Sequence, residues 1–491
     1  MISDWTTKDQ RKLMWLLLGL ISMLVIFFAG SAQGLSVQGQ RVLGILAFAV
    51  VVWISQAISY PLSAIAIIAF LILSLGFAPA GDAGAGLLGT GKAITMGLSG
   101  FTNSGWVLVA TGLFLSAIIV ETGLEKRMAL AILKIFGIKT KNVILGMILA
   151  MYAFTFFIPS ATARAATLIP IALGLIETFK VSRKSGFAKA LTMAVGISAT
   201  LSGIGLLTGV AQNPVTVFFV EKTTGKGTTW MEWLIISEPF ALVLAGVLYF
   251  LLTRMIKEEI AEIPGGKEIV YKELQELGPM SRREKKVFVI LVVTIIAWAT
   301  ESFHKIDANT VSIFTVLILL APIVGVTDWK SVGKKVDYGT LLLFAAGISL
   351  GEQVLRTGAA TWLAKNSLGT MGVTTMPPFL ILISIAAAVF VIRIAFSSST
   401  SATATLIPTI LGFLLSAETP NLPIAGMAII TSYILLFGSL LPVNVPQTMI
   451  AYGTDTFDTT DFLKITIPLT IIGFLIWLLF YATYWHWLGL V

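Results

Sequence analysis

Residues 160–170 read Ser-Ala-Thr-Ala-Arg-Ala-Ala-Thr-Leu-Ile-Pro, and residues 398–408 read Ser-Ser-Thr-Ser-Ala-Thr-Ala-Thr-Leu-Ile-Pro. The two stretches start 238 positions apart (398 − 160), about half of the 491-residue chain. Each lies inside a long apolar segment. Many secondary transporters build one substrate site from two such pseudo-symmetric pieces. The doubled motif therefore predicts a membrane protein made of two related halves.

The composition indicates a polytopic helical membrane protein. Hydrophobic residues make up 56% of the chain, charged residues only 12%, and the mean hydropathy is +0.93, far from a soluble globular composition. Cysteine is absent and there are two histidines, which excludes disulfides and iron–sulfur clusters and leaves no visible metal site. The net charge of +8 is a weak hint of nucleic acid in such a chain, and we expect no nucleic-acid partner.

The apolar runs predict about 11 transmembrane helices and two re-entrant hairpins in an all-α fold. With a cytoplasmic N-terminus, most of the 33 Lys and Arg residues fall on the cytoplasmic side, as the positive-inside rule requires. A bacterial plasma membrane is the simplest location. We predict hairpins at residues 141–179 and 377–416, and spans near residues 12–30, 41–58, 61–79, 105–121, 186–210, 233–255, 286–302, 309–325, 339–352, 421–443 and 463–488.

The hairpins are predicted from helix breakers at the centre of both motif segments. Pro159 lacks an N–H and ends or kinks a helix, and Ser160 can cap a new one. In the second segment five hydroxyl residues run from Ser397 to Ser401, which is unfavourable on a lipid-facing surface. The alternative is that Ser and Thr only hold packed helices together. Two clusters at matched positions favour hairpin tips, which are tolerated at mid-membrane inside protein or a water-filled cavity.

Each half also contains an interrupted span after its motif. Gly, Asn and Pro break the segments 203–214 and 438–447, and broken helices in corresponding places point to a transport site. We predict that Asn213 and Asn444 line the site; the alternative is that they bind backbone groups freed by the breaks. In the predicted topology the halves run in opposite directions, as inverted repeats.

The predicted site suits an anion. New helices begin at both tips, where first-turn N–H groups lack partners and carry partial positive charge, and the hydroxyls add donors. Two such tips facing each other suit a ligand with a carboxylate at each end. Arg164 and Arg393 are the two cations at membrane depth and are predicted to compensate the charge of a dianion. The alternative is a snorkelling or locally paired arginine.

At these residues the chain resembles the divalent anion/sodium symporter family, which transports di- and tricarboxylates. The family's hallmark is a Ser-Asn-Thr triplet at each tip followed by a small-residue run ending in Leu-(Ile/Leu)-Pro, and this chain matches that frame twice. The resemblance covers nearly the whole chain. It implies an elevator-type homodimer with scaffold and transport domains, embedded in lipid. It also implies substrate contacts from both triplets, at Ser160, Ala161, Thr162, Ser398, Ser399 and Thr400. Gly209, which begins the match to the family's first break, is predicted to contact the substrate as well.

The departures from the family pattern concern sodium. Ala161 and Ser399 replace the two Asn residues, and Arg164 occupies a position that is usually small and polar in the family. Ala161 removes a neutral oxygen ligand and a guanidinium repels Na⁺. We therefore expect a chain closest in character to the sodium-independent exchangers of the family, with no Na⁺ or other cofactor required. The expected substrates are of the succinate, 2-oxoglutarate, malate or citrate class. The alternative is a Na⁺-coupled dicarboxylate symporter.

Other function classes are disfavoured. An enzyme needs a catalytic constellation, and the sequence has no paired intramembrane acids and no His cluster. A channel needs rings of selectivity residues, which are not evident. The predicted organisation is first-repeat scaffold helices at 1–140, the first hairpin and transport-domain helices at 141–255, a cytoplasmic connector at 256–286, second-repeat scaffold helices at 287–376, and the second hairpin and transport-domain helices at 377–491.

Overall fold

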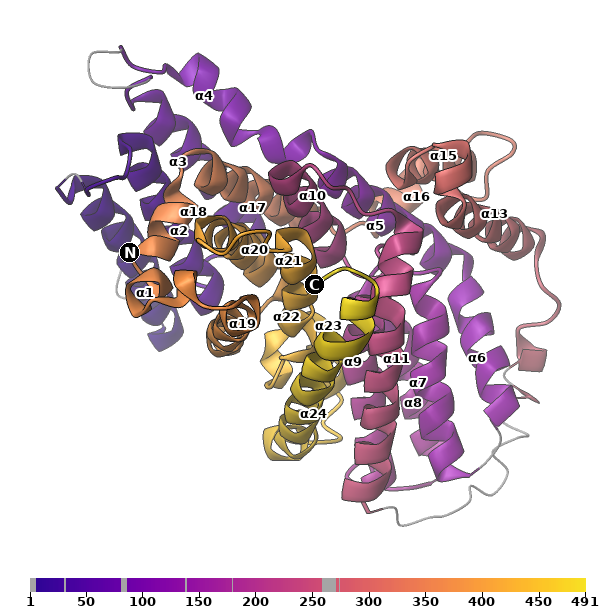
Figure 1. The fold of residues 1–491 in the computed structure, drawn as a ribbon. Coiled ribbons are helices and arrows are strands. Elements are labelled where there is room, and N and C mark those ends of the chain that lie inside the picture. The colour runs from indigo at the N-terminus through magenta and orange to yellow at the C-terminus, as the bar shows by residue number, and fades with distance from the viewer. Residues whose placement is uncertain are drawn as a thin grey trace.

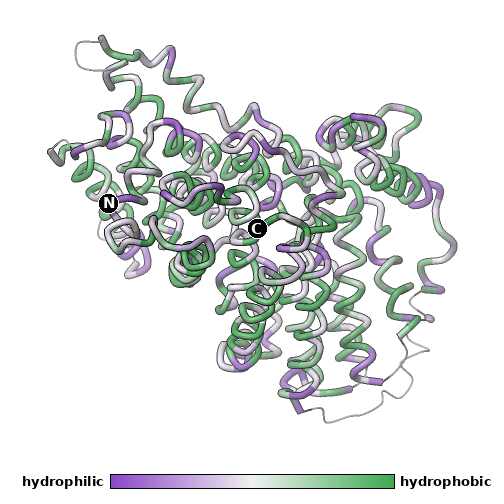
Figure 2. The backbone as a smooth tube through the Cα atoms, in the orientation of Figure 1, coloured by the Kyte–Doolittle hydropathy of each residue, from purple (hydrophilic) through white to green (hydrophobic). Residues whose placement is uncertain are grey.

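The computed structural model describes residues 6–491 except 31, 81–85, 137–138, 179, 258–270 and 273. Within these residues the fold is helical, with an isolated β-bridge between Pro79 and Leu87. Nine of the described helices are long and apolar enough to cross a membrane. Figure 2 shows that the helices are apolar along most of their length and that hydrophilic residues gather near their ends. The chain is therefore a multi-pass membrane protein.

The first helices of the chain lie together at one end of the molecule (Figure 1). Thr6 and Asp9 form a capping box that starts the first helix, and the Ser36 side chain caps the second by accepting from Gly39 N. The four helices of this group are α1 (Thr7–Phe28), α2 (Val37–Ser55), α3 (Tyr60–Gly76) and α4 (Thr90–Gly97).

The next seven helices include the first motif and the first break. Several of them stand side by side at the other end of the molecule (Figure 1). They are α5 (Ser104–Thr122), α6 (Leu124–Phe136), α7 (Thr140–Thr155), α8 (Ala161–Thr178), α9 (Gly186–Gly205), α10 (Gln212–Thr224) and α11 (Trp230–Met255).

The second half of the chain begins after the connector, part of which (258–270 and 273) lies outside the described residues. Its helices are α13 (Arg282–Ala299), α14 (Glu301–His304), α15 (Ala308–Leu320), α16 (Trp329–Gly333), α17 (Tyr338–Arg356), α18 (Ala359–Lys365), α19 (Pro378–Ala395), α20 (Ser399–Ser416), α21 (Ile424–Ser432), α22 (Ile434–Phe437), α23 (Pro446–Tyr452) and α24 (Thr459–Phe480).

At each predicted hairpin the chain forms two helices separated by a short break, and re-entry on one side of the membrane stays a prediction. Residues 156–160 separate α7 from α8, and residues 396–398 separate α19 from α20. We call residues 156–162 tip 1 and residues 396–400 tip 2. Tip 1 lies on α5, where Gly112 leaves room for Pro159, and tip 2 contacts α2 through a hydrogen bond from Ser397 Oγ to the carbonyl oxygen of Trp53 (3.3 Å).

Two breaks separate neighbouring helices at the level of the tips. Break 1 is residues 206–211, between α9 and α10, and break 2 is residues 438–445, between α22 and α23. A helix lies over every predicted span, including residues 421–443, which contain α21 and α22. The sequence analysis did not identify the helices α6, α10 and α23. The number of helices that cross the bilayer and the domain boundaries remain predictions.

The buried apolar residues form two clusters. One joins α1–α4 with α17 and α18, and the larger one includes α5–α11 and α19–α24. Helix α17 packs against α3 of the smaller cluster and α20 of the larger one. Gly347 and Gly351 permit the second contact, because a Cβ at either position would lie 2.5 Å from Ala404 Cβ or Pro408 Cγ. Glycines four residues apart allow this close helix approach.

Candidate functional site

A cavity of about 850 Å³ lies between the two tips and is lined by all six predicted tip residues. They are Ser160, Ala161, Thr162, Ser398, Ser399 and Thr400. Residues 238 positions apart in the sequence thus line one cavity. Pockets of this size accommodate small organic ligands. Contact of these residues with a substrate remains a prediction.

The tips present hydrogen-bond donors to the cavity. Ser160 Oγ accepts from Ala163 N at 3.2 Å, and Ser398 Oγ accepts from Ser401 N at 3.5 Å. A serine oxygen that accepts a backbone N–H still has its own proton to donate. The starts of α8 and α20 add the partial positive charge of a helix N-terminus. Each tip is therefore suited to bind one anionic group.

The two halves also touch each other beside the tips. Gln212, at the start of α10, donates from Nε2 to Thr400 Oγ1 of tip 2 at 3.4 Å. Gln447, in α23, donates from Nε2 to Thr200 Oγ1 in α9 at 2.8 Å. Both glutamines line the cavity, and they stand 235 residues apart (447 − 212). The sequence analysis missed them, although the matched spacing within the two broken segments was a usable signal.

The predicted site residues of the breaks do not line the cavity. Asn213 Nδ2 donates to the carbonyl oxygens of Gly203 and Leu206, both at 2.7 Å. Asn444 Nδ2 donates to the carbonyl of Phe396 at 2.8 Å, and Asn444 Oδ1 accepts from Leu441 N at 2.8 Å. Both asparagines thus bind backbone groups freed by the breaks, which was the alternative interpretation. The prediction that they face the ligand is corrected accordingly.

Gly209 and the two arginines also lie behind the cavity wall. Arg164 and Arg393 are each 0% exposed, and neither lines the cavity. The Gly209 carbonyl accepts a hydrogen bond from Arg164 at 2.8 Å. The guanidinium groups are locally paired with neutral oxygens, so they do not snorkel to the membrane surface. Both arginines therefore lie behind the residues that line the cavity, and their charge-compensating role remains a prediction.

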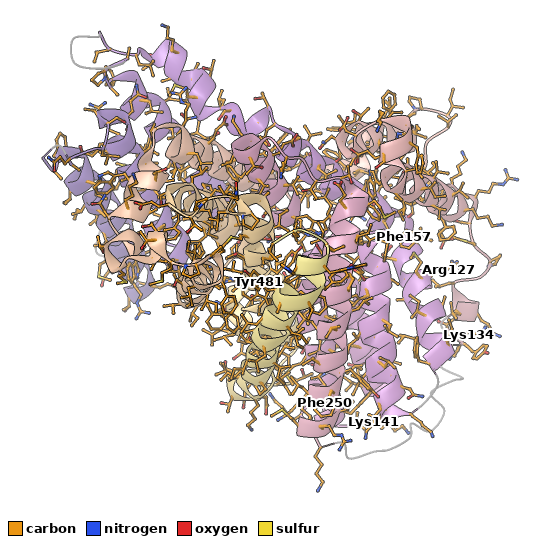
Figure 3. The ribbon with its side chains drawn as sticks, in the orientation of Figure 1. Arg127, Lys134, Lys141, Phe157, Phe250 and Tyr481 are labelled. Carbon is orange, nitrogen blue, oxygen red and sulfur yellow. The ribbon has the colours of Figure 1, made fainter. Side chains whose placement is uncertain are left out.

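Charged residues gather at the end of the cavity formed by α6 and the loop before α17. Glu125, Lys126, Lys335 and Asp337 line this end, and Lys335 pairs with Glu121 of α5 at 2.6 Å. On another side of α6, Arg127 (Figure 3) pairs with Glu284 of α13 at 2.8 Å. The apolar positions of this amphipathic segment could have predicted a helix, but the sequence analysis treated the segment as a connection.

Glu125 has an altered pKa because α6 holds it in a largely buried position. Its side chain is 8% exposed, and Oε2 has no hydrogen-bond partner among the described residues. Burial raises the pKa of Glu125 to about 7, with an opposing effect of Lys335. Helix α6 is not one of the nine candidate spans, and Glu125 lines the cavity from this helix.

We expect Glu125→Gln to stabilise the protein at pH 8 but not at pH 4. Because the folded-state pKa is above the unfolded value, the folded state binds more protons between about pH 4.5 and 7, and stability falls as pH rises through that window. Allowing for solvent screening at the cavity, the expected effect is about 1–2 kcal/mol. Thermal unfolding in detergent at several pH values measures it. An equal shift at both pH values would contradict the assignment.

The comparisons with known proteins agree with a transporter. The family model described as the sodium:sulfate symporter transmembrane region matches residues 10–491. A protein of Cupriavidus necator named only "Membrane protein" is 40% identical over 96% of this chain and 92% of its own length. A protein of Staphylococcus saprophyticus named sodium-dependent dicarboxylate transporter SdcS is 27% identical over 90% of this chain and 85% of its own. Its Staphylococcus aureus namesake is 26% identical over the same shares.

Two solved structures share the fold. The YdaH transporter of Alcanivorax borkumensis matches with a TM-score of 0.57 and 10% identity, covering 88% of this chain and 98% of its own. The MtrF protein of Neisseria gonorrhoeae matches with a TM-score of 0.55 and 12% identity, covering 96% and 94%. At these identities the likeness concerns the fold alone.

The prediction that sodium is not required is wrong. The matching family is described as sodium symporters, and the two staphylococcal relatives are named sodium-dependent. The structure shows why the argument from Arg164 failed: its guanidinium lies behind tip 1 and donates to backbone carbonyls. The loss of the Asn side chain at Ala161 leaves the hydroxyls of Ser160 and Thr162 at the cavity.

Proposed function

Because the chain belongs to the sodium:sulfate symporter family, we propose that it is a Na⁺-coupled symporter of dicarboxylates such as succinate. Membership of this family also confirms that the chain is a transporter and not an enzyme. Homodimer formation and insertion into a bacterial plasma membrane with a cytoplasmic N-terminus are part of the proposal.

One observation carries the choice of substrate. The cavity between the tips is lined by hydroxyl groups from both of them, and each tip adds the N-terminus of a helix. A ligand with one carboxylate at each end can therefore be bound from two sides. The names of the staphylococcal relatives support the same substrate class. Hydroxyl and backbone oxygens near the tips are the hard, neutral ligands that an alkali cation requires.

The buried arginines support the binding of a dianion. Arg164 and Arg393 form no salt bridge with an acid among the described residues. A positive charge at membrane depth without a counter-ion is unfavourable. A dicarboxylate in the cavity would offset this cost from a short distance. We retain both residues as charge-compensating groups that act through space and not by contact.

The order of elements supports inverted repeats and an elevator movement. In each half a helix with a small-residue face (α5 or α17) precedes a hairpin, a broken segment and a long helix. The tips and breaks surround the cavity, while α17 meets α20 at glycines. Small residues let the two groups of helices approach closely, and the proposed movement takes place at this interface. The group with the tips would carry the substrate across.

Uptake of radiolabelled succinate into proteoliposomes tests the function. We expect an inward Na⁺ gradient to drive succinate accumulation in empty vesicles. The accumulated succinate is expected to be at least about tenfold higher than in vesicles with equal Na⁺ on both sides or with K⁺ in place of Na⁺. Unlabelled dicarboxylates are expected to compete more strongly than sulfate. Uptake that occurs only into substrate-preloaded vesicles and ignores Na⁺ would contradict the proposal. Competition by sulfate alone would contradict the substrate class.

A further inference from the structure

The guanidinium of Arg164 connects three separate segments of the first half. Its Nη1 donates to the carbonyl oxygens of Ile158 in tip 1 (2.6 Å) and Gly209 in break 1 (2.8 Å). Its Nη2 donates to the carbonyl of Ala199 in α9 at 3.0 Å. One side chain therefore holds a hairpin tip, a helix and a break together.

Arg393 makes the same kind of connection in the second half. It donates to the carbonyls of Phe396 in tip 2 and Leu435 in α22, both at 2.8 Å, and to that of Asn444 in break 2 at 3.1 Å. Its Nη2 also lies 2.9 Å from Ser399 Oγ and 2.8 Å from Ser439 Oγ. Tip, helix and break are again joined by one guanidinium.

The acceptors of the two arginines correspond, although the arginines do not. Phe396 follows Ile158 by 238 positions (396 − 158), the spacing of the doubled motif. Asn444 follows Gly209 by 235 positions (444 − 209), and Leu435 follows Ala199 by 236 (435 − 199). The position 238 after Arg164 is Ala402, and the position 238 before Arg393 is Thr155. Equivalent sets of carbonyls are thus served by side chains from different arms of the two hairpins.

The interrupted helices explain why both halves need such a group. A helix end leaves carbonyl oxygens without intrahelical partners, and unsatisfied carbonyls are costly at membrane depth. A guanidinium has five N–H donors in a planar fork and can serve acceptors on several segments at once. Neither guanidinium lines the cavity, so its effect on a ligand passes through the segments and the Ser399 hydroxyl to which it donates.

We infer that Arg164 and Arg393 are positioning residues that fix each hairpin tip to the break of its own half. In this arrangement the tips do not open as independent gates; each tip moves together with its break. The spacing between the two sets of hydroxyl donors is then set by the two guanidinium groups. The inference rests on the proposed function only for the identity of the bound anion.

Arg393 also determines whether the Ser399 hydroxyl, which lines the cavity, donates or accepts a hydrogen bond there. Because Ser399 Oγ lies within hydrogen-bond distance of the guanidinium and a guanidinium has no acceptor, the serine oxygen accepts and its proton remains available as a donor. Ser399 lines the cavity. Its hydroxyl therefore presents a donor to a carboxylate. At tip 1 the corresponding residue is Ala161, so this effect is confined to tip 2.

Amide hydrogen exchange tests the positioning role without any substrate. In Arg393→Ala we expect faster exchange in residues 396–400 and 438–445, with residues 156–162 and 206–211 unchanged; Arg164→Ala is expected to give the reverse pattern. Arg254→Ala, at the exposed end of α11, is the matched control. Unchanged exchange at tip 2 in Arg393→Ala, or equal acceleration at both tips, would overturn the inference.

Transport kinetics test the effect on Ser399. We expect Arg393→Ala and Ser399→Ala each to raise the KM for the dicarboxylate about tenfold or more, and the double variant to be no worse than Arg393→Ala. Free guanidinium at millimolar concentration is expected to restore part of the affinity in Arg393→Ala but not in Ser399→Ala. Additive effects, or a lower kcat with an unchanged KM, would contradict this role.

A conservative variant covers the case in which Arg393→Ala does not fold. Arg393→Lys keeps the charge, but an ammonium cannot span acceptors on three segments as the planar fork does. We expect it to fold, to exchange faster at tip 2 and to show the raised KM. Normal exchange and KM in Arg393→Lys would mean that the charge alone suffices. Failure of the unmodified protein to take up dicarboxylates would instead contradict the proposed function and leave the exchange prediction intact.

Discussion

Asn213→Ala and Asn444→Ala are each expected to destabilise the protein by about 2–4 kcal/mol. Each asparagine is 1% exposed. Asn213→Ala removes the side-chain donor of the Gly203 and Leu206 carbonyls. Asn444→Ala removes a donor to the carbonyls of Ile394 and Phe396, of which Phe396 keeps the Arg393 guanidinium, and also removes the acceptor of Leu441 N. Alanine cannot replace these hydrogen bonds, and water at this depth is scarce. The lost hydrogen bonds exist only in the folded state, so their loss lowers the free energy of unfolding.

Thermal and denaturant unfolding in detergent measure this effect. Asn366→Ala is the matched control, because Asn366 is exposed and its single side-chain bond goes to the carbonyl of Trp362 at the end of α18. We expect the control to change stability by less than about 0.5 kcal/mol. Equal effects of Asn213→Ala and Asn366→Ala would show that the carbonyls of break 1 find other partners. A raised KM with unchanged stability in Asn213→Ala would indicate that Asn213 contacts the substrate.

Gly347→Ala is expected to cost about 1–3 kcal/mol of stability and to slow transport. The added Cβ would lie 2.5 Å from the Cβ of Ala404, so α17 and α20 would have to separate. If the tips move past α17 during transport, this contact changes in every cycle. The rate is then expected to fall more than the affinity for the dicarboxylate.

A second substitution makes this prediction specific. Ala404→Gly removes the atom with which the new methyl group would collide, so the double variant is expected to regain most of the lost stability and rate. Gly246→Ala in α11 is the control, because a Cβ there meets nothing within 4 Å. The measurements are thermal unfolding and initial rates of uptake. If Ala404→Gly restored neither stability nor the transport rate, the contact between positions 347 and 404 would not be the cause of the loss.

The local features of this fold could be predicted from the sequence. The apolar stretches locate the long helices. Pro159, the run of hydroxyl residues from Ser397 and the two broken segments locate the hairpin tips and the breaks. Each of these features depends on backbone chemistry within a few residues. The six tip residues could be predicted for the same reason. Their meeting at one cavity followed from the doubled motif, since equivalent pieces of two halves come together in such proteins.

The partners of buried polar side chains were decided only by the tertiary structure. Asn213, Asn444 and the two arginines occur beside the motif in the sequence, but their long side chains can turn toward the cavity or away from it. The choice depends on which carbonyl groups the folded helix ends leave unpaired. The error about sodium arose here, because an arginine near a tip was assumed to face the ligand.

The sequence by itself therefore determined the class of protein, most of the long helices and the two tips, and it predicts that the tip hydroxyl groups bind an anion. Only the tertiary structure decided that Gln212, Gln447 and Glu125 line the cavity while the arginines serve backbone carbonyls behind it. The physical reason is the range of the interactions. Helix breaks and caps are set by neighbours in the chain, whereas each guanidinium is placed by carbonyl groups that lie up to 51 residues away along it.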